Sequence, residues 1–313
     1  MEHQLTRVAV LGLGTMGPGI VATLARGGLS VSAYDPNQEA IDRAGEAVDA
    51  ASEVLDQLAR PQFPSSAPTL TNDFEECIQD ADLVIENIPE NLELKLEVLS
   101  TLGKRVSSDC ILASDSSGIP ITQLQEEVSN PSRVVGMHWS NPPHIIPMIE
   151  VIAGEQTSSD TVGAIVSLIR HLGLVPVTVK KDVPGFVENR ILYALLRECF
   201  DLVEAGVIDP RDLDTCVSWG IGYKLAVIGP MALVDMAGLD IYESVATYLN
   251  QGLCNRSDVT TVVSDATKRG ELGMKAGKGI YEYSPEEIKS LRAYRAKALV
   301  EVQGAMKSIP HPT

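Results

Sequence analysis

The hydrophobic and polar positions at the start of the chain alternate between two kinds of segment. Residues 8–12 form a short, β-branched apolar run that ends in a glycine, and residues 29–35 resume the same extended pattern. Between them, residues 17–27 carry Ile20, Val21 and Leu24 at a helical spacing. A strand, a helix and a second strand within about thirty residues predict a βαβ unit with parallel strands.

The same alternation continues through the next 150 or so positions. Residues 36–58 have helical spacing, and the Pro- and Ser-rich segment 60–68 is typical of a surface loop. Further apolar runs predict strands at residues 83–86, 110–113, 134–138, 148–152 and 175–179. With helices between these strands, the pattern predicts an α/β fold built on a Rossmann-type doubly wound parallel sheet.

The pattern changes at Pro184-Gly185, and no strong strand follows residue 179. Residues 186–205 form a helix that is apolar on more than one face, so we expect it to provide both a domain core and a subunit contact. We therefore predict two domains, a sheet domain over residues 1–183 and a smaller, all-helical C-terminal domain over residues 184–313. The second would complete the substrate pocket and form a homodimer.

Composition restricts the class of protein. A length of 313 residues favours about two domains. The formal charge of −17 repels phosphate backbones and anionic membranes, so neither nucleic acid nor a membrane is expected as a partner. The cysteines are odd in number and lack a C-x-x-C pair, which argues against a disulfide framework and a metal site. No apolar stretch approaches the ~18 residues of a spanning helix, and we expect an unsecreted, cytoplasmic protein.

A glycine-rich turn follows the first predicted strand. Gly12, Gly14 and Gly17 match G-x-G-x-x-G, with Thr15 and Met16 at its variable positions, and the motif opens the first predicted helix. In such turns the first glycine makes the bend, the second lets a pyrophosphate approach and the third packs helix on strand. Asp35 ends the second strand, where a carboxylate accepts hydrogen bonds from ribose hydroxyls and repels a 2′-phosphate. The pattern predicts a site for NAD rather than NADP, although Asp35 could also be a helix cap before Pro36.

Four further segments resemble the 3-hydroxyacyl-CoA dehydrogenase family. In chain order they are Ile85-Glu-Asn-Ile-Pro-Glu-Asn91 with Lys95, Ala113-Ser-Asp-Ser-Ser117, His138-Trp-Ser-Asn-Pro142 with Glu150, and Pro184-Gly-Phe-Val-Glu-Asn-Arg190. They occur in the family's order and cover almost the whole chain. The resemblance implies an NAD-dependent dehydrogenase that acts on a small-molecule substrate.

Site residues follow from this resemblance. It implies that His138 and Glu150 form the catalytic dyad. It implies that Ser117 and Asn189 bind the substrate. It also implies that Glu90, Lys95 and Asn141 lie near the nicotinamide half of the cofactor. The chemistry of the dyad agrees. His138 ends one predicted strand and Glu150 lies on the next, so neighbouring parallel strands would bring them together at the carboxyl edge of the sheet. A carboxylate on one imidazole nitrogen leaves the other free to take the substrate hydroxyl proton.

Several departures from the family concern the substrate. The coenzyme A enzymes typically read His-Phe-Phe-Asn-Pro, whereas this chain has Trp139 and Ser140, and Asp115-Ser-Ser-Gly118 replaces Asn-Thr-Ser-Ser. Residues 36–94, where those enzymes carry a basic arm, contain only Arg43 and Arg60 as cations. Because coenzyme A brings several phosphate charges, we expect a small, coenzyme-A-free carboxylated alcohol or aldehyde.

The chain is most similar to the family's branch that acts on free substrates such as gulonate, carnitine and pyridine-carboxylate aldehydes, and the Trp-Ser variant favours the last of these. With an aldehyde, His138 would activate water and hydride would leave the resulting hydrate. Two alternatives remain open, an L-3-hydroxyacyl-CoA dehydrogenase and a non-enzymatic, crystallin-like NAD-binding protein. The second predicts a broken catalytic set, whereas Ser117, His138, Glu150 and Asn189 are all present.

Overall fold

The chain folds into two compact units, of which the first ends at Arg190 and the second begins at Ile191. The computed structural model describes residues 5–309. The predicted domain boundary lay at residues 183 and 184, so the first unit also contains the turn and the first residues of the helix that follow this position.

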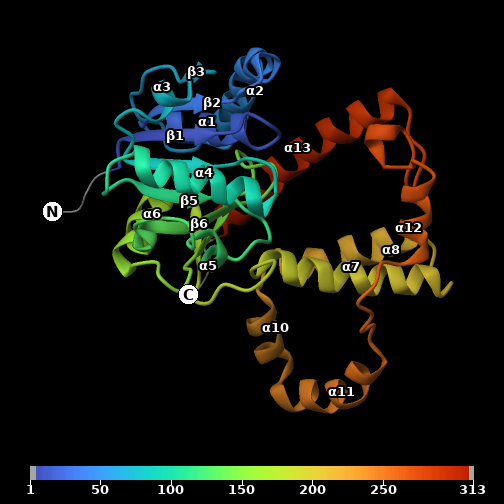
Figure 1. Cartoon of the computed structure of the whole chain (residues 1–313). Helices are drawn as coiled ribbons and strands as arrows, with labels where there is room; N and C mark the ends of the chain where they lie inside the picture. The colour runs from blue at the N-terminus through green and yellow to red at the C-terminus, as the bar shows by residue number, and fades with distance from the viewer. Residues whose placement is uncertain (1–4, 310–313) are drawn as a thin grey trace. The chain divides into compact units, whose positions relative to one another are not determined.

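The first unit is built on an eight-stranded sheet (Figure 1). Its order is β3-β2-β1-β4-β5-β6-β7-β8, the first six strands following the Rossmann order. The predicted strands are present, and β3 is an addition that the sequence analysis did not expect. The strands are β1 Arg7–Leu11, β2 Ser30–Tyr34, β3 Thr69–Thr71, β4 Leu83–Glu86, β5 Ile111–Ser114, β6 Val134–Trp139, β7 Met148–Ile152 and β8 Val175–Val179.

Strand direction differs from the prediction at one place. Strands β3, β2, β1, β4, β5 and β6 are parallel, but β7 pairs with β6 in the antiparallel sense and β8 is parallel to β7. The expectation that His138 and Glu150 lie on neighbouring parallel strands was therefore wrong. The connection between the two strands, residues 140–147, is shorter than the dozen or so residues that a parallel crossover needs.

Helices cover both faces of the sheet, and the central strands β4, β5 and β6 are accordingly buried along their whole length rather than alternating. Val8 and Val10 of β1 pack in one buried cluster with residues of α1, α2 and α6, whereas Ala9 and Leu11 pack in a second cluster with residues of α3, α4 and α5. The helices are α1 Gly17–Arg26, α2 Gln38–Gln57, α3 Phe74–Ile78, α4 Leu92–Arg105, α5 Ile121–Leu124 and α6 Ser159–His171, with a short 3₁₀ turn at Pro131–Arg133.

Local capping sets where several of these helices begin. The side chains of Asn37, Asp73, Asn91 and Ser158 accept hydrogen bonds from backbone N–H groups in the first turns of α2, α3, α4 and α6. The cap of α2 is thus Asn37 and not Asp35. This leaves the carboxylate of Asp35 at the end of β2, beside the glycine-rich turn.

The second unit is helical. Its elements are the greater part of α7 (Glu188–Glu204), α8 Pro210–Thr215, a π-helical stretch Cys216–Gly222, α9 Tyr223–Leu225, α10 Pro230–Ala237, α11 Leu239–Gly252, α12 Thr261–Lys268, a 3₁₀ turn Met274–Ala276 and α13 Pro285–Ser308. Among its described residues, extended pairing is limited to isolated bridges from Lys278 to Gly273 and Glu282. An all-helical second unit was predicted.

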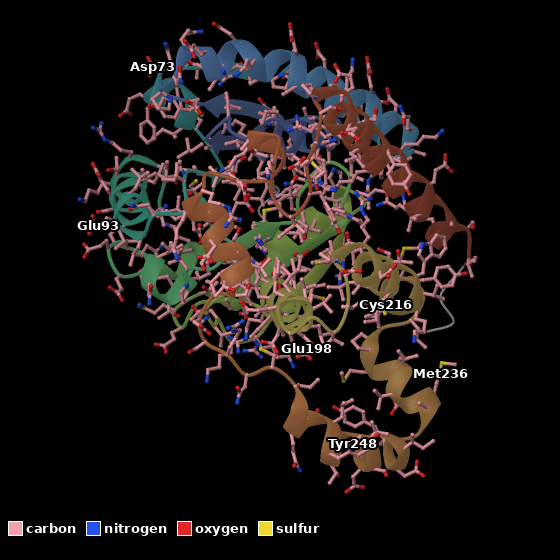
Figure 2. All side chains as sticks on the ribbon, turned by 90° about the vertical axis from the view of Figure 1, so that its right-hand side faces the viewer. Asp73, Glu93, Glu198, Cys216, Met236 and Tyr248 are labelled. Carbon is pink, nitrogen blue, oxygen red and sulfur yellow. The ribbon has the colours of Figure 1, made fainter. Side chains whose placement is uncertain are left out.

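Many apolar side chains of the second unit are exposed in the single chain. None of the residues of α7 is buried, so the expectation that this helix forms a domain core is not met within one chain. Figure 2 shows Met236 on α10 and Tyr248 on α11 extending away from their helices, and these side chains are 76% and 66% exposed. Ala266 is the only buried apolar residue described in this unit.

No single helix among the described residues has the length and apolar composition to cross a membrane. One helix pair, Pro210–Leu225 with Pro230–Ala237, meets both criteria only when its two parts, bent by 85°, are counted together.

Candidate active site at the β6–β7 pair

A histidine–carboxylate pair lies where β6 and β7 face each other. His138 and Glu150 are direct partners in the register of the two strands, and Nδ1 of His138 lies 2.8 Å from Oε2 of Glu150. Both residues are buried, with exposed fractions of 5% and 1%. Because Glu150 occupies Nδ1, the other ring nitrogen, Nε2, is the one left to exchange a proton with a ligand.

The second carboxylate oxygen of Glu150 is held by the start of α7. Oε1 accepts hydrogen bonds from the backbone N–H groups of Val187 and Glu188, at 3.0 and 3.1 Å. Phe186, fully buried, places its ring 5.8 Å from that of His138. These contacts fix the orientation of the carboxylate and, through it, the tautomer and orientation of the imidazole.

The electrostatics of the pair favour a charged histidine. Burial acts to lower the pKa of His138, but the hydrogen bond that the ring donates to Glu150 and the negative charges of Glu150 and Glu188 outweigh burial and raise the pKa. For Glu150, burial acts to raise the pKa, and the hydrogen bonds from His138 and the two backbone N–H groups bring it below its usual value. The pair therefore favours the imidazolium next to a carboxylate more than isolated side chains would.

Ser140 and Glu188 stand beside the dyad, and the sequence analysis gave neither a role. Ser140 Oγ donates a hydrogen bond to Glu188 Oε2 at 2.5 Å. One ring nitrogen of His138 and one carboxylate oxygen each of Glu150 and Glu188 all lie within 4.8 Å of one another. The available signal was the Trp-Ser departure from His-Phe-Phe-Asn-Pro, which puts a hydroxyl where an aromatic ring is usual.

The predicted substrate residues Ser117 and Asn189 lie together. Asn189 Nδ2 donates to the backbone carbonyl of Ser117 at 2.8 Å. Asn189 lies next to the boundary between the two compact units, since the first unit ends at Arg190. Its amide nitrogen holds the loop that carries Ser117, and the exposed Ser117 side chain is presented by that loop.

Glu90 and Lys95 belong to a charged network under the same loop. Glu90 Oε1 accepts hydrogen bonds from Ser116 Oγ and from the backbone N–H groups of Ser117 and Gly118, at 2.7, 3.1 and 2.8 Å. Lys95 Nζ lies 3.5 Å from Glu90 Oε2. Burial acts to raise the pKa of Glu90, but these hydrogen bonds and Lys95 hold it below its usual value.

Lys95 is itself fully buried. Its Nζ donates to Glu86 Oε1 at 2.7 Å and to the backbone carbonyl of Ile88 at 3.2 Å. Glu86 is also fully buried, and its other oxygen accepts from Ser114 Oγ at 2.6 Å. The sequence analysis named Lys95 but not Glu86, and the structure places the lysine between two carboxylates.

The glycine-rich turn has the shape that a dinucleotide requires. Gly12 has φ +104°, and a Cβ there would lie 2.4 Å from the carbonyl oxygen of Asn87, so only glycine fits. A Cβ at Gly14 would meet nothing within 4 Å, which leaves open space beside the backbone at the N-terminus of α1. Such a turn at a helix N-terminus suits the pyrophosphate of NAD.

Asp35 joins this turn to the second strand. Its Oδ2 accepts from the backbone N–H of Leu13 at 2.9 Å and its Oδ1 from that of Asn37 at 3.0 Å. Thr15 is exposed on the turn and Met16 is the N-cap of α1. Asn141 is exposed on the loop after β6. The residues present therefore fit an NAD whose adenosine ribose lies near Asp35.

Among the described residues, one group of side chains has the spacing of a metal site, His138, Glu150 and Glu188. Every member has a hydrogen-bond partner. Nδ1 of His138 and Oε2 of Glu150 bond each other, while Glu188 accepts from Ser140. This arrangement suits proton transfer better than metal binding.

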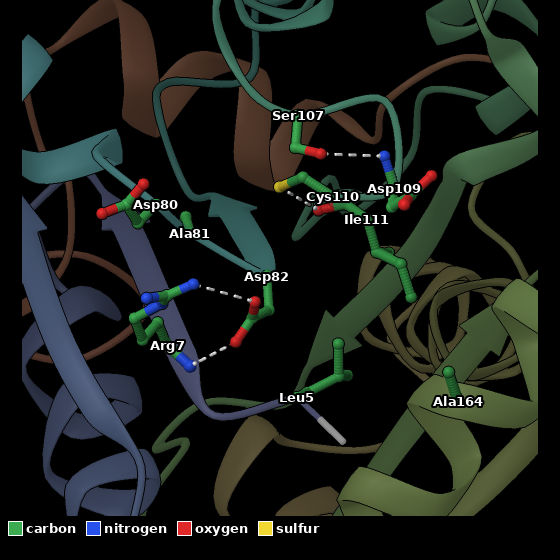
Figure 3. Close-up of a pocket in the computed structure, with 10 residues that line it drawn as sticks. All are labelled: Leu5, Arg7, Asp80, Ala81, Asp82, Ser107, Asp109, Cys110, Ile111 and Ala164. Carbon is green, nitrogen blue, oxygen red and sulfur yellow. Dashed lines mark hydrogen bonds and ion pairs between the residues drawn. The ribbon is translucent and has the colours of Figure 1, made fainter. Parts of the chain in front are cut away.

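Two observations away from the dyad bear on ligand binding. Arg60, one of the two cations in the segment 36–94, is buried, and its guanidinium donates to the backbone carbonyls of Gly173 and Ile145. It is therefore not available to a phosphate. The second observation is a pocket with a volume of about 340 Å³. Arg7, Asp82 and Cys110 are among the residues that line it (Figure 3). These residues lie where β1, β4 and β5 begin, the sheet edge away from the carboxyl end of β6 that carries His138.

Comparison with known proteins agrees with this geometry. The model of the 3-hydroxyacyl-CoA dehydrogenase NAD-binding domain matches residues 7–183, and that of the 3-hydroxyacyl-CoA dehydrogenase C-terminal domain matches residues 185–283. Both halves of the chain are thus similar to one family.

Individual relatives are similar over most of the chain. A 5-formyl-3-hydroxy-2-methylpyridine 4-carboxylate 5-dehydrogenase of Mesorhizobium japonicum is 59% identical over 96% of this chain and 97% of its own length. An L-carnitine dehydrogenase of Burkholderia mallei is 31% identical over 96% and 94%. A crystal structure of a 5-formyl-3-hydroxy-2-methylpyridine 4-carboxylic acid 5-dehydrogenase, described as an NAD+-dependent dismutase, has a TM-score of 0.95 at 57% identity. The alignment covers 98% of this chain and 100% of that one.

Proposed function

The chain belongs to the 3-hydroxyacyl-CoA dehydrogenase family and is an NAD-dependent oxidoreductase, and we propose that it oxidises the aldehyde group of a pyridine carboxylate with NAD. The observation that carries the proposal is the 59% identity, over nearly the full length of both chains, to a dehydrogenase of 5-formyl-3-hydroxy-2-methylpyridine 4-carboxylate. The intact pair of His138 and Glu150 supports it.

The roles of the side chains follow from their contacts. NAD, when bound, supplies the hydride acceptor; the turn from Gly12 to Gly17 would hold its pyrophosphate, and Asp35 its ribose. His138 takes a hydroxyl proton of the aldehyde hydrate at Nε2, while Glu150 stabilises the resulting imidazolium at Nδ1. The hydroxyl of Ser117, on the loop that Glu90 and Asn189 hold, is a donor to the reacting oxygen.

Charge supports a small substrate over a coenzyme A thioester. With Arg60 bound to backbone carbonyls, Arg43 on α2 is the remaining cation of the segment 36–94. A coenzyme A ligand brings a pyrophosphate and a 3′-phosphate, whereas a small carboxylate needs one or two cations. Arg190, at the start of α7, is the candidate for that carboxylate.

A substrate panel tests the proposal. NADH formation is followed with pyridine-carboxylate aldehydes, L-carnitine, gulonate, free 3-hydroxy acids and 3-hydroxybutyryl-CoA at equal concentrations. We expect the pyridine aldehydes to have the highest kcat/KM. Turnover confined to the coenzyme A thioester would overturn the proposal and indicate a 3-hydroxyacyl-CoA dehydrogenase.

The same enzyme is proposed to be a homodimer through its helical unit. Trp219, Met231 and Met236 are 74%, 76% and 76% exposed in the single chain, and apolar surface on this scale is normally covered by a partner subunit. Sedimentation should give twice the chain mass of 33.6 kDa. A monomer at micromolar concentration would contradict it.

A cytoplasmic location is proposed as well. The five cysteines are all free, as expected in a reducing compartment. Fractionation of cells that express the tagged chain tests this, and recovery in a secreted or membrane fraction would contradict it.

A further inference from the structure

Glu188 is a second carboxylate beside the dyad, and the family resemblance gave it no role. Its Oε2 accepts a hydrogen bond from Ser140 Oγ at 2.5 Å, and its backbone N–H donates to Glu150 Oε1 at 3.1 Å. One residue thus contacts both Glu150 and the loop that follows His138. Its carboxylate lies at most 4.8 Å from a ring nitrogen of His138.

The three side chains of His138, Glu150 and Glu188 differ in their exposure to solvent. His138 is 5% exposed and Glu150 is 1% exposed, whereas Glu188 is only half-buried. Two hydrogen bonds of ~2.8 Å meeting at one water molecule span about 4.5 Å. The distance from a ring nitrogen of His138 to the carboxylate of Glu188 is thus within the span of one bridging water, and Glu188 is open on its other side to solvent.

We propose that Glu188, oriented by Ser140, carries the proton that His138 collects in each turnover out to solvent. The inference rests on the proposed oxidation of an aldehyde hydrate. In that reaction the C–H bond breaks and its electron pair leaves as hydride to NAD, while an O–H proton passes to His138 and the carbon becomes a carboxyl. The proton then moves from the imidazolium to the carboxylate of Glu188 and on to water, which restores the neutral base.

The charges around His138 explain why such a route is needed. The carboxylates that face it are Glu150 from β7, Glu188 from α7 and Asp115 from the loop after β5. The charges of Glu150 and Glu188 raise the pKa of His138 despite its burial, whereas Asp115 is itself shifted toward its neutral form. Because the charged ring is favoured, return to the neutral base requires an acceptor that can pass the proton on. The apolar ring of Phe186 packs against the imidazole, with ring centroids 5.8 Å apart.

The test compares Glu188→Gln with Glu93→Gln. Glutamine keeps an oxygen that accepts from Ser140, so the fold should be retained, but it cannot take a proton. Glu93 is an exposed residue in the first turn of α4, so its variant is a control with the same charge change, also in the first turn of a helix. Each variant is assayed by stopped-flow and steady-state NADH formation across pH and across concentrations of a small buffer such as imidazole.

We expect Glu188→Gln to lower kcat about tenfold, less than the ~10²-fold or more expected for loss of the base itself. The affinity for NAD should be unchanged. The acidic limb of the pH profile should move to lower pH, and added imidazole should restore part of the rate, whereas wild type and Glu93→Gln should not respond to imidazole. Ser140→Ala should show a smaller loss of the same kind.

Three outcomes would contradict either the proton relay through Glu188 or the proposed function. A Glu188→Gln enzyme with a wild-type pH profile and no response to imidazole would overturn the relay. A loss of activity that imidazole does not restore, with a lowered melting temperature, would indicate a purely structural role and would also overturn it. Absence of turnover in wild type on pyridine aldehydes would instead contradict the proposed function, and the same variants would then be tested on the substrate that wild type accepts.

Discussion

Nδ1 of His138 lies 2.8 Å from Oε2 of Glu150, and the two residues are direct partners in the register of the antiparallel pair β6–β7. Backbone hydrogen bonds of the sheet therefore fix the positions of both Cα atoms, and the N–H groups of Val187 and Glu188 fix the remaining carboxylate oxygen. The dyad is preorganised by the sheet and by the start of α7, before any ligand binds.

The first prediction concerns this carboxylate. Glu150→Gln should lower kcat/KM by ~10²-fold or more, since general acid–base catalysis contributes on that scale, while NAD affinity stays within about twofold. Removing the negative charge also lowers the pKa of His138, so the acidic limb of the pH profile should shift to lower pH. In the His138→Gln variant, the acidic limb of the pH profile should be absent. Near-wild-type turnover in both variants would remove the pair from catalysis.

A second prediction follows from Asp115, which stands where the family usually has Asn. Burial raises the pKa of Asp115 from 3.8 to about 8, although the N–H of Trp139 donates to its Oδ1 at 2.7 Å. The folded state therefore holds a proton that the unfolded state releases, and the cost of ionising Asp115 grows as pH rises from about 4 to about 8.

Asp115→Asn should remove that cost while keeping the acceptor for Trp139. The variant should be more stable than wild type by about 1–3 kcal/mol at pH 8, with the gain shrinking toward zero near pH 4. Thermal melts at several pH values measure it, with the exposed Asp49→Asn on α2 as the control. A gain that does not depend on pH would contradict the raised pKa.

The third prediction concerns cofactor choice. NAD should bind at least about tenfold more tightly than NADP, because Asp35 offers carboxylate oxygens to the ribose and would repel a 2′-phosphate. Asp35→Asn should reduce the ratio of the NADP dissociation constant to the NAD dissociation constant. Glu39→Gln in the first turn of α2 should leave this ratio unchanged. Fluorescence titration with both cofactors is sufficient. Equal dissociation constants in wild type would exclude the role given to Asp35.

The fourth prediction concerns the buried ion pair of Lys95 and Glu86. Lys95→Met should lower the free energy of unfolding by about 3–5 kcal/mol, because it leaves a fully buried carboxylate without its counter-charge. Lys104→Met, an exposed position on the same helix, should change it by less than about 0.5 kcal/mol. Urea denaturation compares the two variants, and equal effects would show that the pair is not stabilising.

Much of the site was predictable because its residues lie at fixed places along local elements. Gly12, Gly14 and Gly17 follow a strand and open a helix, so spacing alone identifies the turn. The first and fourth strands, β1 and β4, appear as apolar runs because helices bury both faces of the sheet. His138, Glu150, Ser117 and Asn189 were found through their motifs rather than through any pattern of burial.

What the sequence determined by itself was the order of the elements, the nucleotide turn and the identity of the dyad, since these depend on short-range spacing and on motifs. The tertiary structure decided three other features. It set the antiparallel turn between β6 and β7, and it buried Lys95 between Glu86 and Glu90. It also placed the guanidinium of Arg60 on backbone carbonyls. The contact of Ser140 with Glu188 joins residues 48 positions apart. A charged side chain can bind a ligand or stabilise the fold, and its burial and its partners set the free energy of keeping it charged. These partners are often distant in sequence. No local sequence pattern therefore tells which of the two roles the side chain has.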